Sequence, residues 1–220
     1  MEEVKINRKP RIMQLFCKHE GAWFRKKQMF FNLRGTPFIY QGEEIGMENF
    51  ERESIDEFDD IGSHGQYQRA LEEGFTKEEA MHFLNLRSRD NTRTPMQWDS
   101  SEYAGFSNHE PWLKMTGSQD KINVESQFND PNSIYSFYKK MISIRKQEDT
   151  LAYGDFEEVN TVDDVIGYKR TYQGQEIICL CNFTNTEQPI PDIQGNILLD
   201  NYNNYNPTTL KPYQFVMIKK

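Results

Sequence analysis

The spacing of hydrophobic and polar positions changes near residue 150 of the chain. Before it, apolar side chains recur at mostly helical intervals over residues 12–34, with an interruption near Gly21. Residues 36–40 then form a short, mostly apolar run bounded by glycines, which is typical of a strand buried on both faces. A helix followed by a buried strand predicts an α/β arrangement for this part of the chain.

Two later helices carry start signals in the sequence. Thr76 is followed three residues on by Glu79, a capping-box spacing that predicts a helix through about Leu86. Asp130 and Pro131 precede a strongly amphipathic segment, and we expect them to cap a helix there.

Beyond residue 150, short apolar runs alternate with turn residues. This pattern predicts strands at residues 156–159, 165–172, 176–183, 197–199 and 213–218. The regular spacing favours a small antiparallel sandwich, so we place a domain boundary near residue 150, with α/β structure before it and all-β structure after it.

The charge balance argues against some classes of partner. The 220 residues include 26 Lys and Arg against 34 Asp and Glu, and the net charge of −8 disfavours nucleic acid or an anionic membrane. No run approaches the roughly 18 apolar residues of a membrane span, and the amino terminus lacks the apolar core of a signal peptide. We expect a cytoplasmic protein with no nucleic-acid and no membrane partner.

Cysteine and histidine positions do not support a metal site. Three cysteines cannot all pair, and Cys179 and Cys181 stand two apart in an apolar run, as expected for packing on one face of a strand. The four histidines are scattered along the chain. We therefore expect no metal ligands and no cofactor.

Two polar segments are candidates for chemistry. Glu43 and Glu44 directly follow the apolar run, where α/β barrels place their sites, although support of the loop is the favoured interpretation over catalysis. Residues 87–131 form a long irregular segment, and such loops are usually functional. We therefore expect the functional residues to lie within residues 87–131.

Arginines and aromatic rings come together in this long segment. Its members are Arg87, Arg89, Asp90, Arg93, Trp98 and Asp99, followed by Phe106 and Trp112. Guanidinium groups bind sugar hydroxyls and aromatic rings stack on the apolar face of a pyranose. Two interpretations remain open, a saccharide cleft and an internal ion-pair network that holds the loop.

Two long motifs in these segments carry a family resemblance. Residues 34–47 read RGTPFIYQGEEIGM and residues 89–99 read RDNTRTPMQWD. Together with shorter matches over about residues 28–148, they resemble the carboxyl-terminal half of the α-glucosidases of the α-amylase superfamily, in the group of oligo-1,6-glucosidase, dextran glucosidase and trehalose-6-phosphate hydrolase. The resemblance implies the incomplete terminal part of a (β/α)8 barrel, residues 1–150, followed by a small antiparallel β-sandwich, residues 151–220.

The resemblance also implies an activity, the hydrolysis of α-1,6-type glucosidic bonds in short oligosaccharides by a retaining mechanism that needs three acids. In the family, two of these acids precede the matched region, and the third belongs to an Asn-His-Asp-x-Pro-Arg motif. Aligned on Pro10 and Arg11, this chain has Arg8 in place of the aspartate and Asn7 in place of the histidine. A guanidinium inverts the required charge, so we predict no catalytic residue here and no activity of this chain by itself.

The resemblance carries over two substrate-binding residues. Arg11 matches the terminal arginine of that motif, and Arg93 matches the arginine of the RTPMQW motif. About 150 residues outside the sandwich are too few for a complete barrel, which typically takes about 250. The expected partners are therefore an oligosaccharide and either an upstream barrel chain or a second copy. The alternatives to an enzyme are a sugar-binding module, a scaffold, and one half of a split enzyme.

Overall fold

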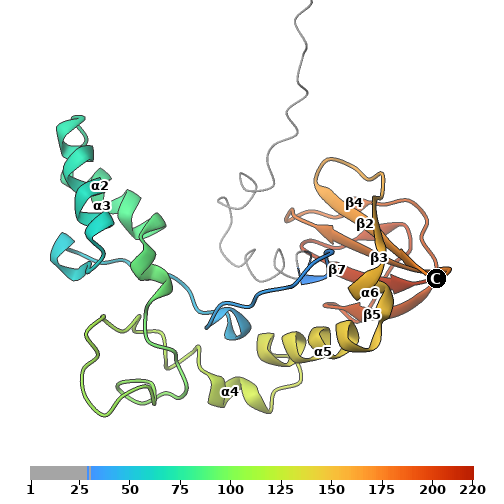
Figure 1. Ribbon diagram of the computed structural model, residues 1–220, viewed down its shortest axis with the longest axis horizontal. Coiled ribbons are helices and arrows are strands. Elements are labelled where there is room, and N and C mark those ends of the chain that lie inside the picture. Colours follow the sequence, from blue (N-terminus) through green and yellow to red (C-terminus); the bar gives the residue numbers. More distant parts are fainter. Residues whose placement is uncertain (1–28, 30) are drawn as a thin grey trace, which may run out of the picture. The chain divides into compact units, whose positions relative to one another are not determined.

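Two compact units make up the described part of the chain (Figure 1). The computed structural model describes Met29 and residues 31–220. Residues 39–138 form one unit, and residues 139–220 together with the described residues up to Phe38 form the other. The described residues include no helix with the length and apolar character needed to cross a membrane. The division into residues 1–150 and 151–220 stays a prediction.

The unit formed by residues 39–138 consists of short helices and long irregular segments. Its elements are the 3-10 turns η2 (Glu43–Ile45), η3 (Ile55–Glu57) and η4 (Arg89–Thr92), the helices α2 (Ile61–Glu72), α3 (Lys77–Arg87) and α4 (Val124–Phe128), and the start of α5 (Ile134–Gln147). Helices α2 and α3 share a buried cluster with the segment before α2, formed by Phe58, Tyr67, Ala80 and Leu84.

The capping box predicted before α3 is present. The Glu79 amide donates to Thr76 Oγ1 over 3.2 Å, and the Thr76 amide donates to Glu79 Oε2 over 2.8 Å. Two amide groups that the first helical turn leaves without partners are thereby satisfied. The helix ends at Arg87, one residue beyond the predicted end.

The helix predicted after Pro131 is also present, with a different cap. Helix α5 begins at Ile134, and the Ser133 hydroxyl accepts the Ser136 amide over 3.1 Å. Asp130 instead accepts the Asn132 amide over 2.9 Å, in the turn before the helix. Serine suits this role because its short hydroxyl reaches the amide three residues later.

The long irregular segment is confirmed between α3 and α5. Apart from η4 and α4, residues 88–133 contain no helix or strand. The Val124 amide donates to the Gln97 carbonyl over 3.0 Å, and the Glu125 amide donates to the Trp98 carbonyl over 2.9 Å. These two bonds close residues 97–125 into a loop, and Leu113 of this loop is buried.

The strand predicted at residues 36–40 is wrong for this structure. These residues have no regular structure, and Phe38 is 89% exposed. A strand needs a hydrogen-bonded neighbour, and both sheets of the described chain lie beyond residue 154. The apolar pattern of residues 36–40 is that of a buried strand, but no described residue forms the backbone hydrogen bonds that such a strand needs.

Residues 155–219 form two antiparallel sheets. The five-stranded sheet has the order β1-β2-β3-β7-β5, and the two-stranded sheet pairs β4 with β6. The strands are β1 (Asp155–Glu158), β2 (Val165–Tyr172), β3 (Gln175–Asn182), β4 (Gln188–Pro189), β5 (Asn196–Asp200), β6 (Thr209–Leu210) and β7 (Phe215–Lys219). The predicted strands are thus confirmed within two residues at each end, and the two-residue strands β4 and β6 are additional.

The sheet is buried on both faces at β3. Ile178 and Leu180 join one hydrophobic cluster of the sandwich, and Cys179 and Cys181 alternate with them toward the other face. Both cysteines are reduced and buried, which confirms the predicted packing role. Burial raises the pKa of the Cys179 thiol to about 12.

A buried arginine joins the short helix α6 (Asp149–Tyr153) to the sheet. The Arg170 side chain in β2 is fully buried. Its guanidinium donates to the carbonyls of Asn32, Leu151 and Gly154 over 2.7–2.9 Å, and to that of Asp155 over 3.3 Å. One side chain therefore fixes the end of α6 and the start of β1, and holds residue 32 against the same unit.

Candidate functional site

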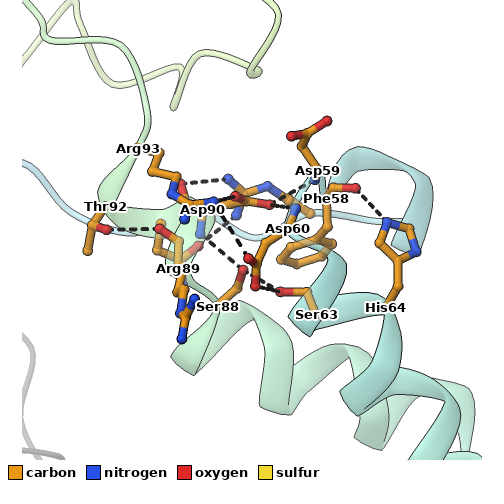
Figure 2. Close-up of polar contacts among 12 residues, drawn as sticks. Phe58, Asp59, Asp60, Ser63, His64, Ser88, Arg89, Asp90, Thr92 and Arg93 are labelled. Atoms are coloured by element: carbon orange, nitrogen blue, oxygen red, sulfur yellow. Dashed lines mark hydrogen bonds and ion pairs between the residues drawn. The ribbon is translucent and has the colours of Figure 1, made fainter.

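A polar cluster connects the segment before α2 with the turn after α3 (Figure 2). We call it the Asp90 cluster, and it consists of Arg52, Asp60, Ser63, Ser88, Asp90, Asn91 and Arg93. Asp90, Asn91 and Arg93 belong to the first half of the RDNTRTPMQWD motif, so these contacts fix the geometry of that half.

Asp90 lies at the centre of this cluster and its side chain is fully buried. Oδ2 accepts the amides of Asp59 and Asp60 over 2.8 and 2.9 Å. Oδ1 lies 3.3 Å from Nη1 of Arg93. Both carboxylate oxygens are therefore committed to holding the start of α2 and the Arg93 guanidinium.

Two serines support Asp90 from the helices. The Ser88 hydroxyl accepts the Asp90 amide over 3.1 Å and lies 2.8 Å from the Ser63 hydroxyl of α2. Ser88 follows the last residue of α3 and caps η4. The end of α3 and the first turn of α2 thus fix the backbone on which Asp90 and Arg93 stand.

Arg52 supports the cluster from its buried side. The side chain is only 2% exposed, and its guanidinium lies over the rings of Phe50 and Phe58, 4.4 and 4.7 Å from their centroids. Nη1 donates to Asn91 Oδ1 over 2.6 Å, and Nη2 donates to the Asp90 carbonyl over 3.3 Å. Burial lowers the pKa of Arg52, while the negative charge of Asp90 acts in the opposite direction.

Arg93 lies at the exposed edge of the cluster. Its side chain is 42% exposed, and Nη1 lies 3.3 Å from Asp90 Oδ1 and 3.6 Å from Asp60 Oδ1. A guanidinium has five N–H donors in a fixed plane, so two carboxylates can orient it while part of it faces solvent. Arg11, the other predicted substrate-binding residue, lies outside the described residues.

The two interpretations left open for the long segment apply to different residues. Asp90 belongs to an internal network, as the ion-pair interpretation states. Asp99 also serves the loop, because the Ser101 hydroxyl and amide donate to its Oδ1 and lower its pKa. Trp98 and Trp112, in contrast, are 51% and 74% exposed, so their rings can receive a ligand.

Glu43 supports its own loop, as the sequence favoured. Its Oε2 accepts the Tyr40 amide over 2.8 Å, and the Tyr138 hydroxyl donates to Oε1 over 3.4 Å. Burial, followed by the charge of Glu43, raises the pKa of Tyr138. Gly42 and Gly46 flank η2 with φ of 87° and 75°, and a Cβ on Gly46 would come within 2.6 Å of Ile134.

Sequence reasoning named Asp90 and Arg93 and missed the other members of the cluster, which are Arg52, Asp60, Ser63, Ser88 and Asn91. Neither the spacing nor the composition around Arg52 marks a buried arginine, and its nearest signal is its place between two phenylalanines. Among the described residues, no group of three His, Cys, Asp or Glu side chains is arranged to hold a metal ion.

Comparisons with known proteins confirm the predicted resemblance. The chain is 36% identical over 221 residues to the oligo-1,6-glucosidase of Halalkalibacterium halodurans, covering 93% of this chain and 39% of that protein. It is 41% identical over 192 residues to the glucan 1,6-alpha-glucosidase of Streptococcus pneumoniae serotype 4, covering 86% of this chain and 36% of the relative. The chain therefore spans less than two fifths of the length of these relatives.

The fold class is confirmed by solved structures. The Bacillus licheniformis trehalose-6-phosphate hydrolase superposes with a TM-score of 0.81 at 31% identity, over 90% of this chain and 38% of that chain. The superposition therefore covers less than two fifths of that structure and shows an α-amylase-family fold for most of this chain. Residues 9–154 match the family model described as alpha amylase, catalytic domain, and the chain belongs to this family.

Proposed function

We propose that these residues form the carboxyl-terminal part of an α-glucosidase-type hydrolase that acts on α-1,6 or related bonds in short oligosaccharides. Relatives named oligo-1,6-glucosidase, glucan 1,6-alpha-glucosidase and trehalose-6-phosphate hydrolase support the substrate class. The observation that carries the proposal is Arg93, which two carboxylates orient at the edge of the Asp90 cluster while its side chain is 42% exposed. Its role is to bind substrate hydroxyls.

Preorganisation makes Arg93 suitable for this role. A free arginine loses side-chain freedom when it binds a ligand, and that loss weakens binding. Here Asp60 and Asp90 already restrict Nη1, so a sugar hydroxyl meets donors in a fixed plane. The exposed rings of Trp98 and Trp112 belong to the same unit and can cover pyranose faces.

The acids of the Asp90 cluster do not suit bond cleavage. A retaining mechanism needs two carboxyl groups about 5 Å apart that face the substrate. Asp90 is fully buried with both oxygens engaged, and Asp60 is 13% exposed and directly precedes α2. We propose that the 220-residue chain by itself binds oligosaccharide without cleaving it. The predicted role of Arg11 and the cytoplasmic location stay predictions.

The test measures cleavage and binding on the same preparation. We expect the purified chain to release no p-nitrophenol from p-nitrophenyl α-glucoside, and to bind isomaltotriose in a calorimetric titration. Arg93→Gln should weaken that binding about tenfold, because it removes charge-assisted hydrogen bonds. Arg69→Gln, at an exposed position of α2, is the matched control. Cleavage by the purified chain, or equal binding by Arg93→Gln and the control, contradicts the proposal.

A second candidate function is assembly with another polypeptide. The observation that favours it is the exposed apolar run at residues 36–40, where Phe38 is 89%, Tyr40 51% and Ile39 37% exposed. Such a segment is suited to pairing with strands of a second chain, either an upstream barrel chain or a second copy.

Sedimentation and co-purification test this assembly. Co-expression with the amino-terminal part of the Halalkalibacterium relative should give a complex with α-glucosidase activity, and Phe38→Ser should weaken it. A sedimentation coefficient that rises with the concentration of the chain by itself would identify the second copy as the partner. A chain that stays monomeric and captures no such fragment contradicts this candidate.

A further inference from the structure

Two tyrosine rings lie in contact where strand β2 of the five-stranded sheet ends. Tyr153 ends α6 and Tyr172 ends β2, and their ring centroids are 5.8 Å apart with an angle of 44° between the planes. Tyr153 is 65% exposed, and Tyr172 is half-buried. Two adjacent rings thus face water in the unit that does not contain the Asp90 cluster.

A rigid frame holds this pair. Arg170 lies two residues before Tyr172 in β2, and alternate residues share a face of a strand. Its buried guanidinium donates to the carbonyls of Leu151 and Gly154, on either side of Tyr153, and to that of Asp155. The backbone that carries both rings is therefore fixed by hydrogen bonds from one side chain, so the rings need no ligand to bring them together.

Polar side chains stand in and near the segments that carry the two rings. Gln173 is exposed in the turn after β2, and its Nε2 donates to the Tyr172 hydroxyl over 3.3 Å. The side chain of Asp155, two residues after Tyr153, is 89% exposed and lies 3.5 Å from Arg34. An amide, a carboxylate and a guanidinium therefore stand in or next to the segments that carry the rings.

This combination matches the chemistry of a sugar. A pyranose has an apolar C–H face, which stacks on an aromatic ring, and hydroxyls around its edge, which bond to polar side chains. A protein partner would need a wider apolar surface around the rings, whereas the flanking residues are Gly154, Asp155, Thr171 and Gln173.

We propose that Tyr153 and Tyr172 form a second carbohydrate-binding site, which takes gluco-oligosaccharides and is distinct from Arg93. The choice of gluco-oligosaccharide rests on the proposed function, while the site itself rests on the ring pair and its frame. It holds the sugar by stacking, with hydrogen bonds between the Gln173 amide and hydroxyls at the sugar edge, and it forms and breaks no covalent bond.

The test follows isomaltotriose by NMR titration of the whole chain. We expect Tyr153→Ala and Tyr172→Ala each to weaken binding at this site about tenfold, because each removes one stacking face. Tyr153→Trp should retain binding, since it keeps an aromatic ring at the position. The matched control is Tyr202→Ala, because Tyr202 is also exposed and its ring lies over Lys211 at 5.2 Å.

Folding and self-association are checked on the same variants. The near-ultraviolet circular dichroism of each variant should retain the wild-type band shape, and Tyr153→Trp covers the case in which an alanine variant fails to fold. Either of two results overturns the site. The first is unchanged isomaltotriose binding by both alanine variants, and the second is no binding at all by the wild type up to millimolar sugar. An effect of the variants on sedimentation but not on binding also overturns it, and identifies a contact between copies.

Arg93→Gln separates this inference from the proposed function. If the tyrosine variants lose binding and Arg93→Gln does not, the second site stands and the role of Arg93 fails. If only Arg93→Gln loses binding, the second site fails and the proposed function stands. If each change removes one of two binding events, both are supported.

Discussion

Replacement of Arg52 by methionine tests whether a buried cation organises the Asp90 cluster. The guanidinium is 2% exposed, contacts two rings, and donates to Asn91 Oδ1 and to the Asp90 carbonyl. Methionine keeps the apolar stem and removes the charge and the donors. The buried Asp90 carboxylate then loses a nearby positive charge, and Asn91 Oδ1 loses its 2.6 Å donor.

The magnitude follows from the two kinds of loss. A hydrogen bond to a charged group contributes about 1.5–3 kcal/mol, and removal of one partner of a buried charge pair costs about 3–5 kcal/mol. Asp90 retains Arg93 and two backbone amides, so we expect the lower end, about 3 kcal/mol. With a urea m-value of about 2 kcal/mol/M, the unfolding midpoint should fall by about 1.5 M.

Tryptophan fluorescence is a suitable assay because Trp98 and Trp112 both lie in the unit of residues 39–138. Trp23 is replaced by phenylalanine in all variants, so that the signal reports this unit. The matched control is Arg69→Met, an exposed arginine of α2, which should shift the midpoint by less than about 0.3 M. A midpoint for Arg52→Met within the range of the control would refute the reasoning.

Three further predictions concern other parts of the chain. Thr76→Ala should lower the free energy of unfolding of the unit of residues 39–138 by about 1 kcal/mol, because it removes the cap of α3, and Thr92→Ala is the control for urea unfolding. Burial raises the pKa of Tyr138, so the unfolded state releases this proton first as the pH rises above about 10. The free energy of unfolding of residues 39–138 should therefore fall above that pH by at most about 1.4 kcal/mol per pH unit. Tyr138→Phe should make this fall with pH less steep, and an unchanged slope in the variant would contradict the prediction. Arg170→Met should destabilise the sheet unit by about 3 kcal/mol, since it leaves buried carbonyls without donors, and hydrogen exchange of β2 amides that matches the wild type would count against this.

Local patterns predicted the elements whose stabilising contacts lie within the element or its neighbour. Strand β2 has the predicted bounds, Val165–Tyr172, because its pairing with β3 needs only the turn at Gly174. The start of α3 follows from Thr76 and Glu79 for the same reason. These contacts join residues that are close in sequence, so the sequence pattern specifies them.

The hydrophobic and polar patterns did not predict contacts between residues that are far apart in the sequence. The strand predicted at residues 36–40 depends on neighbours that the described chain does not contain. Arg52 meets Asn91, 39 positions away, and no periodicity marks such a pair. The candidate site was therefore located by its motif, while the buried contacts that hold Arg93 in place required the structure.

The two thiols at the centre of β3 allow opening of the sheet to be followed by chemical modification. Cys179 and Cys181 are inaccessible to alkylating reagents while β3 stays paired with β2 and β7. Only a thiolate reacts, and the pKa of about 12 for Cys179 keeps that form scarce at neutral pH. In a Cys17→Ser variant, each alkylated molecule is therefore one in which β3 separated from its neighbouring strands. The fraction of alkylated protein, followed over time by mass spectrometry, gives the rate of this opening.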